Sequence, residues 1–236
     1  MNTHKKTARI VGVLFIIGTV AYSLSVVALD ILDDPDYLAN VSANENQIII
    51  GALFILIMGF ALAMVPVMMF PIFRKFNEAL ALGYVVFRGA LETVTYFGGV
   101  IIWLLLITLS QEYVKAGAPD ASYFQTLGTL LLEAADWIDY ISTLAFGLGA
   151  LMFYYLLYQS KLIPRWLSGW GLIGAILVLA VGLLAMFGLD LAILWAPLAL
   201  QEMVLAVWLI VKGFNPSAIA SASAKKELSE TNESSV

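Results

Sequence analysis

Residues 47–73, QIIIGALFILIMGFALAMVPVMMFPIF, form an apolar stretch that contains no charged side chain. A helix needs about 20 predominantly apolar residues to cross the hydrocarbon core of a bilayer, which is roughly 30 Å thick. The stretch exceeds that length, and its apolar residues do not alternate with polar ones as they would in a barrel strand. It therefore predicts a membrane-spanning helix.

Five further stretches of similar character flank this helix, at residues 9–32, 79–110, 123–158, 166–188 and 191–211. Hydrophobic residues make up 61% of the 236-residue chain and charged residues only 12%. An average soluble domain carries about twice that share of charge, so a soluble enzyme and a nucleic-acid-binding protein are excluded. The sequence predicts an all-α polytopic membrane protein with six transmembrane helices, whose first partner is the lipid bilayer.

The basic residues fix the expected orientation of the bundle. Six crossings place 10 of the 12 Lys and Arg residues on one side: Lys5, Lys6, Arg9, Arg74, Lys75, Lys161, Arg165, Lys212, Lys225 and Lys226. The loops on the other side are acidic. Because cytoplasmic loops are enriched in Lys and Arg, we expect a cell-membrane protein with both termini in the cytoplasm.

The chain divides into three expected parts. Residues 1–8 form a cytoplasmic leader, residues 9–214 the transmembrane domain, and residues 215–236 a disordered cytoplasmic tail rich in Ser, Ala, Glu and Lys. Residues 79–110 and 123–158 would form helices about 48 and 54 Å long, more than the bilayer core requires. We expect helices three and four to extend toward the outside as a hairpin, or to tilt strongly.

Several kinds of chemistry are excluded by residue counts. The chain has no Cys, and its one His, His4, lies outside the apolar stretches. Disulfides, thiolate metal sites and bis-histidine haem ligation therefore do not apply. No cofactor is expected and no catalytic residue is assigned, and whether a metal binds stays open.

The first candidate cluster, which we call the inner charge cluster, consists of Arg88, Glu92, Gln201 and Glu202. Counted from the cytoplasmic end of each helix, Arg88 lies about 12 Å deep, Glu92 about 18 Å and Glu202 about 15 Å. The common depth predicts a triad in which Glu202 bonds Arg88 across two helices, and Arg88 reaching out to the cytoplasmic face is the alternative. Charges inside a membrane segment indicate either a ligand or transport role or a structural ion pair.

The second candidate cluster, which we call the outer carboxylate cluster, consists of Glu133, Asp136 and Asp139. Their spacing of three keeps neighbouring side chains close on a helix. Three carboxylates are suited to holding a hard cation, passing protons or attracting cations. The alternatives are that they simply face water, or that they perform acid–base chemistry.

Three motifs resemble one known family: LIPRWLSGWG at residues 162–171, PLALQE at 197–202 and WLIVKGF at 208–214. Together with Arg88 and Glu92 they are similar to the bacterial membrane-protein family called domain of unknown function 4386, over roughly residues 7–214. The resemblance implies a bacterial multi-helix inner-membrane protein. It implies no activity, ligand or catalytic residue.

Three functions remain open from sequence. The first is non-enzymatic binding or movement of a small or lipophilic molecule, or support of a membrane partner. The second is a proton- or cation-coupled transporter, which at this length would act as a homo-oligomer and shows no inverted repeat. The third is a lipid-modifying enzyme with a carboxylate site, which lacks the dense Asp-rich or His-rich patterns that such enzymes use.

Overall fold

The computed structural model describes residues 3–117 and 121–221, and over these residues it is helical without a strand. The labelled elements are, in chain order, α1 (Thr3–Leu29), η1 (Asp30–Asp33), α2 (Tyr37–Ala43), α3 (Glu45–Phe73), α4 (Glu78–Tyr84), η2 (Val85–Leu91), α5 (Glu92–Ala116), α6 (Ala121–Ser160), α7 (Arg165–Ala185), η4 (Ala192–Trp195) and α8 (Ala196–Val211). η1 and η4 are short 3₁₀ turns, whereas η2 is a π-helix that joins α4 to α5 without a break in the rod.

Six helical rods within the described residues are long and apolar enough to cross a membrane. They are Thr3–Asp33, Glu45–Phe73, Glu78–Ala116, Ser122–Ser160, Arg165–Ala185 and Ala192–Val211. The all-α, six-span fold predicted from sequence is therefore confirmed, with each rod overlapping one of the predicted stretches. The helix α2 was not predicted; it lies in the loop after α1 and packs against α5.

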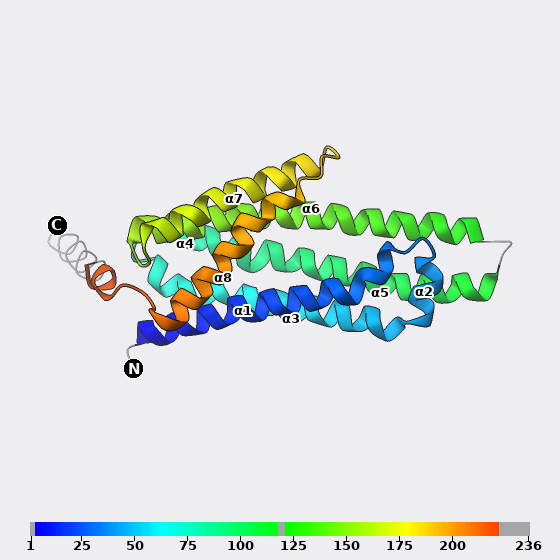
Figure 1. Cartoon of the computed structure of the whole chain (residues 1–236), viewed down its shortest axis with the longest axis horizontal. Helices are drawn as coiled ribbons and strands as arrows, with labels where there is room; N and C mark the ends of the chain where they lie inside the picture. Colours follow the sequence, from blue (N-terminus) through cyan, green and yellow to red (C-terminus); the bar gives the residue numbers. More distant parts are fainter. Residues whose placement is uncertain (1–2, 118–120, 222–236) are drawn as a thin grey trace, which may run out of the picture.

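The six rods form a ring. α1 packs against α3 and α8, α8 packs against α7, α7 against α6, α6 against α5, and α5 closes the ring against α3. Figure 1 shows α8 crossing obliquely between α1 and the α6–α7 pair.

Aromatic side chains fill the ring near the end at which both termini lie. The ring centroids of Tyr84 and Phe153 are stacked 5.0 Å apart, and Phe73 meets Phe153 edge-on at 5.7 Å. Tyr154 and Phe15 complete the cluster at 5.0 and 6.0 Å from Phe153. All five side chains are buried, so this half of the bundle is closed by a dense apolar plug.

α5 and α6 project together beyond the opposite end of the bundle, as Figure 1 shows. Their rods, Glu78–Ala116 and Ser122–Ser160, are each 39 residues long, against 21 and 20 residues for the last two rods. The predicted extension of helices three and four is thus present as a hairpin. The α7–α8 pair covers only part of the length of α6.

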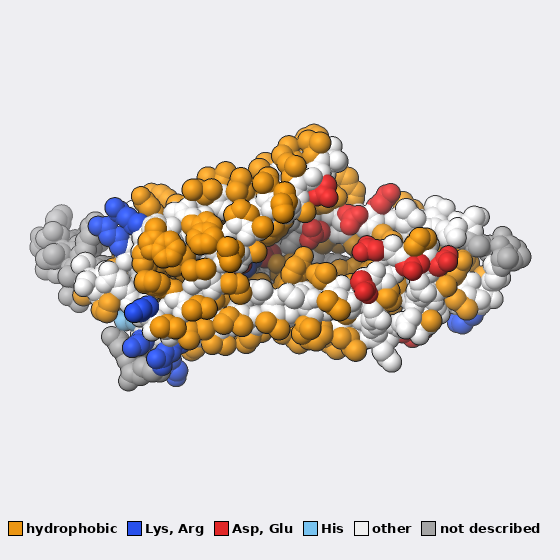
Figure 2. Space-filling view, in the orientation of Figure 1, with side chains coloured by type: hydrophobic (Ala, Val, Ile, Leu, Met, Phe, Trp, Pro, Cys, Tyr) orange, Lys and Arg blue, Asp and Glu red, His pale blue; other side chains and the backbone are white. Residues whose placement is uncertain are grey.

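The two ends of the molecule differ in charge. Figure 2 shows Lys and Arg side chains at the end with both termini, and Asp and Glu side chains over the opposite half. Lys5 near the start of α1, Arg74 after α3 and Arg165 at the start of α7 lie at the basic end. The separation agrees with the division of charges predicted from sequence.

The structure adds detail to the expected parts 1–8 and 215–236. α1 already begins at Thr3, and Ala8 is fully buried, so the leader is part of the first helix. Residues 216–221 are helical, and the Ile219 side chain is buried against the core. The Asn215 backbone N–H donates to the Leu162 carbonyl at 2.8 Å, which anchors this turn. The rest of the predicted tail lies outside the described residues.

Candidate functional site

The π-helix η2 places Arg88 inside the bundle. Arg88 is 5% exposed, and a Cβ built on Gly149 of α6 would lie 3.1 Å from its Cβ and 3.2 Å from its backbone nitrogen. α6 therefore approaches the backbone of η2 as closely as a glycine permits. Single π-turns within α-helices occur frequently at functional sites, and here the turn coincides with the first residue of the inner charge cluster.

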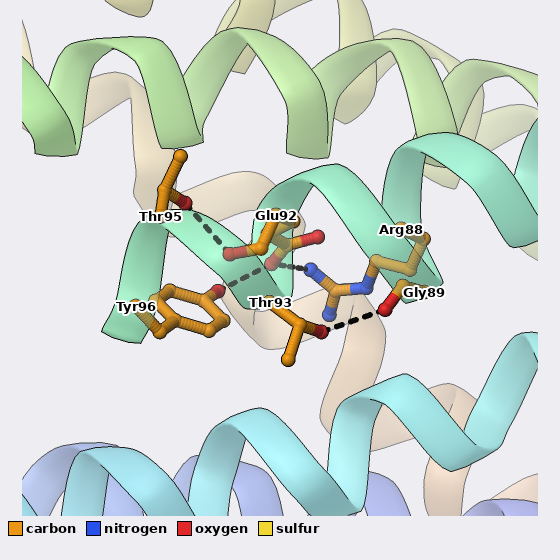
Figure 3. A network of polar contacts seen from close by, with 6 residues as sticks. All are labelled: Arg88, Gly89, Glu92, Thr93, Thr95 and Tyr96. Atoms are coloured by element: carbon orange, nitrogen blue, oxygen red, sulfur yellow. Dashed lines mark hydrogen bonds and ion pairs between the residues drawn. The ribbon is translucent and has the colours of Figure 1, made fainter. Parts of the chain in front are cut away.

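Arg88 pairs with Glu92, the residue four positions along the same rod. The Arg88 guanidinium donates through Nη1 to Glu92 Oε1, and the Tyr96 hydroxyl donates to that same oxygen (Figure 3). Arg ahead of Glu is the poorer order for such a pair in a regular helix, yet the pair forms at the end of η2. The alternative of Arg88 reaching out to the cytoplasmic face is not what the structure shows.

Arg88 makes a further contact outside this pair, whereas one oxygen of Glu92 does not. The Arg88 guanidinium carbon lies 4.4 Å from the ring centroid of Phe146, a cation–π contact with α6. Glu92 is 1% exposed, and its second oxygen, Oε2, is buried and has no hydrogen-bond partner among the residues that the structure describes. Figure 3 shows this oxygen pointing away from Tyr96, on the side of Glu92 that faces Arg88. A buried carboxylate oxygen without a donor is costly, so the site has capacity for one more donor.

Gln201 lies apart from this pair. Its amide is fully buried, accepts a hydrogen bond from the Tyr154 hydroxyl at 2.6 Å and donates to the Leu167 carbonyl at 3.0 Å. These bonds join α6, α7 and α8. With both ends of the amide satisfied, Gln201 holds the three helices together and is not part of the Arg88–Glu92 pair.

Glu202 does not form the direct interhelix bond of the predicted triad. It is partly exposed, and no ion pair joins it to Arg88 among residues 3–117 and 121–221. It still interacts electrostatically with Arg88 and Glu92. The inner charge cluster is thus one contact pair, Arg88–Glu92, with Glu202 nearby as a second carboxylate.

The outer carboxylate cluster lies exposed on α6. Asp136 interacts electrostatically with Glu133 and with Asp33 at the end of η1, and Asp139 interacts with Asp136. Within the described part of the chain, no group of three or more His, Cys, Asp or Glu residues is arranged to hold a metal ion. The carboxylates therefore provide a negative field and not an assembled metal cage.

The two predicted clusters are connected along the facing sides of α5 and α6. We call the groups that run from Glu92 past Tyr96 to Asp139 and Asp136 the column. Arg88 contacts Phe146, and α5 and α6 run antiparallel from there. The eight residues from Arg88 to Tyr96 and the seven from Phe146 back to Asp139 both span roughly 10–12 Å. Tyr96 and Asp139 accordingly lie at one level, where they interact electrostatically. Figure 2 shows a hollow between α1 and α8 with carboxylates around it, on this same half of the molecule.

Gly99 lies on the same helix, three residues beyond Tyr96. The residue is buried, yet a Cβ built on it would meet no atom within 4 Å. Glu92, Tyr96 and Gly99 stand at positions i, i+4 and i+7 of the helix and therefore share one face of α5. The space thus lies on the same helix face as the Glu92 carboxylate and beyond Tyr96.

Three aromatic residues near the Arg88–Glu92 pair were not predicted from sequence: Tyr96, Phe146 and Trp195. Tyr96 was available from its spacing of four after Glu92, which puts its hydroxyl within reach of the carboxylate. Phe146 and Trp195, whose rings stack at 5.3 Å, carry no such signal, because aromatic residues are common throughout these helices.

Comparisons with known proteins give one match. A family model described as "Domain of unknown function (DUF4386)" matches residues 10–213. No curated protein and no solved structure matches the chain.

Proposed function

We propose a function from the residues of the site alone, because the chain belongs to the DUF4386 family, whose defining domain has no known function. The protein is a multi-helix membrane protein. We infer that it binds a small, largely apolar molecule between its helices and that it is not an enzyme. The observation that carries the proposal is the open space beside buried Gly99, on the face of α5 that also carries Glu92 and Tyr96. Ligand sites are commonly apolar spaces with a few convergent polar groups.

Replacing Gly99 by leucine tests this site. A Cβ at this position meets no atom within 4 Å, so we expect the variant to fold while the leucine side chain fills the space. Native mass spectrometry of the purified protein should show a bound small molecule on the wild type and a loss of it in Gly99→Leu. Gly169→Leu is the matched control, because a Cβ there also meets nothing within 4 Å but lies at the start of α7 near the basic end. Equal occupancy in all three proteins, or none in the wild type, would refute the proposal.

A second candidate is proton- or cation-coupled transport. The observation in its favour is the column of acidic groups that leads from Asp136 and Asp139 past Tyr96 to buried Glu92. Chains of carboxylates in membrane segments serve proton and cation pathways. No feature of the described residues favours the lipid-modifying enzyme, because no carboxylate group there is arranged for a metal.

The proposed site faces the outside of the cell membrane. Basic residues gather at the end with both termini, and this charge bias supports a cytoplasmic location for that end. The acidic half, including the hollow and the α5–α6 hairpin, then faces outward.

Cysteine labelling of intact cells checks this orientation. The chain has no native Cys, so single substitutions are easily interpreted. Ala39 on α2 and Ala79 on α4 are both exposed helical alanines at opposite ends of the bundle. An impermeant maleimide should label Ala39→Cys from outside and should label Ala79→Cys only after the cells are permeabilised. The reverse pattern would invert the topology.

A further inference from the structure

We propose that α6 carries a dimer interface, on which the α6 of a second copy of this chain packs in parallel. The inference goes beyond the proposed binding site and does not depend on it. It follows from the spacing of apolar side chains on α6, from their exposure and from the position of the bilayer along this helix.

An apolar stripe runs along almost the whole length of α6, and we call it the α6 stripe. Its members recur at alternating steps of four and three residues: Tyr123, Leu127, Leu130, Ala134, Trp137, Ile141, Leu144, Leu148, Leu151, Tyr155 and Tyr158. This spacing is the heptad repeat of helices that pack side by side in a coiled coil. Because a straight helix has about 3.6 residues per turn, a strict heptad stripe drifts around it, and a partner helix follows the stripe by supercoiling.

The stripe is exposed along its length. None of its side chains is buried, although α6 packs against both α5 and α7. Seven of them are 36–64% exposed: Tyr123, Leu130, Trp137, Ile141, Leu148, Tyr155 and Tyr158. At about 200 Å² for a large apolar side chain, these seven present roughly 700 Å² on one copy. A stable interface buries about 800 Å² on each partner, so the stripe with its four half-buried members is large enough for a dimer.

The hydrocarbon core of the bilayer ends partway along this stripe. α6 and α7 are antiparallel, and a Cβ built on Gly182 would lie 2.8 Å from Cγ2 of Thr143. Three residues further on, Ala185 ends α7 at the level of Tyr140. The 21 residues of α7 span about 31 Å, which matches the thickness of the core. The rings of Trp137 and Tyr140, 5.6 Å apart, thus lie where aromatic residues gather at the membrane interface.

The outer part of the stripe stands beyond the core. From Trp137 to Tyr123 the helix rises about another 21 Å, and Figure 1 shows this part of α6 continuing past the end of α7. Leu130 is 56% exposed there and Tyr123 64%. Apolar surface outside the core gains free energy when it leaves water, whereas lipid-facing surface has no such driving force. Lipid cannot cover this part, so the stripe requires a partner helix that also extends beyond the bilayer.

A second copy of the chain supplies such a helix. Two copies in one membrane have the same orientation, so a two-fold axis along the membrane normal sets Leu130 opposite Leu130 and Trp137 opposite Trp137. No stripe position is charged. Glu133 is the one acid at the flanking positions e and g of the heptads, and in a parallel pair it faces Ile138 of the second copy. The paired stripes therefore bury no charge and oppose no like charges.

Cysteine cross-linking in the membranes of expressing cells tests the dimer. The chain has no Cys, so Leu130→Cys introduces a single thiol. Mild oxidation should join two copies through it, because facing stripe positions lie within the span of a disulfide. Thr129→Cys is the matched control, since it is the neighbouring exposed position and is rotated about 100° away from the stripe. It should give little or no cross-linked product.

A charge placed on the stripe tests the purified full chain. Light scattering of the wild type in detergent should give the protein mass of two chains. Leu130→Glu should raise the dissociation constant of the dimer at least about tenfold, because each copy then loses a buried leucine. Leu130 is exposed within one copy, so the variant should keep the helix content and the melting behaviour of a folded monomer. Thr129→Glu is the control and should remain dimeric.

The outcomes decide between the possible occupants of the stripe. Cross-linking at Leu130 and not at Thr129, together with monomers of Leu130→Glu, supports the proposal. Equal cross-linking at both positions, cross-linking at neither, a monomeric wild type or a dimeric Leu130→Glu variant overturns it. A cross-linked product that contains one copy of this chain and a different protein also overturns it, and assigns the stripe to that other partner.

Discussion

Arg88→Leu is expected to destabilise the folded protein by about 3–5 kcal/mol, the usual cost of removing one partner from a buried ion pair. The substitution leaves the Glu92 carboxylate, already without a partner on Oε2, with a single hydrogen bond from Tyr96. It also removes the cation–π contact with Phe146. Thermal unfolding of the purified protein in detergent measures the loss.

The double variant Arg88→Leu/Glu92→Gln should recover most of that stability. The neutral amide does not need a cation, so the charge stranded by the single substitution is gone. Glu202 needs no substitution, because it is partly exposed and forms no direct ion pair with Arg88 within the described residues. Arg165→Leu is the matched control: its guanidinium is exposed at the start of α7 over Tyr158, and its loss should cost less than about 1 kcal/mol. Equal losses in the single and double variants would show that Arg88 acts through its packing and not through its charge.

The spans and the charged ends could be predicted from sequence because both depend on composition over long windows. An uncharged stretch such as residues 47–73 has few alternatives to a spanning helix, and the excess length of helices three and four follows from counting residues. Depth along a helix is equally predictable from its rise per residue. Arg88 and Glu92 were placed in one buried layer in this way, and the structure pairs them.

The rotation of each helix could not be predicted. Glu202 was expected to face Arg88 because the depths agreed, yet α8 packs against α1 and α7, and it is Gln201 that turns into the core. One residue along a helix is a rotation of about 100°, which decides between a buried amide and a partly exposed carboxylate. The proximity of Tyr96 and Asp139 could not be predicted for the same reason, because it depends on how α5 and α6 are rotated toward each other.

Local irregularities of the helices could also not be predicted from sequence. The π-helix η2 has no signal in the residues Val85–Leu91, which read as ordinary helix. Burial of Ile219 depends on the turn anchored by Asn215 on the Leu162 carbonyl, a contact between segments far apart in the chain. A short polar window with one isoleucine gives no reason to expect it.

Gly171→Ala is expected to destabilise the protein by about 2 kcal/mol or more, because overpacking a well-filled core typically costs about 1–3 kcal/mol and a broken buried hydrogen bond adds to it. A Cβ at this position would overlap the ring of Tyr154, which is 1% exposed among the aromatic residues of the plug and cannot move aside freely. Shifting that ring also breaks its hydrogen bond to Gln201, the link between α6 and α8. Gly169→Ala, two residues earlier on α7, introduces the same methyl group into open space and should stabilise the helix by up to about 1 kcal/mol. Thermal unfolding of the two variants in one detergent compares them directly, and equal melting temperatures would mean that α6 and α7 are not packed as closely as the structure has them.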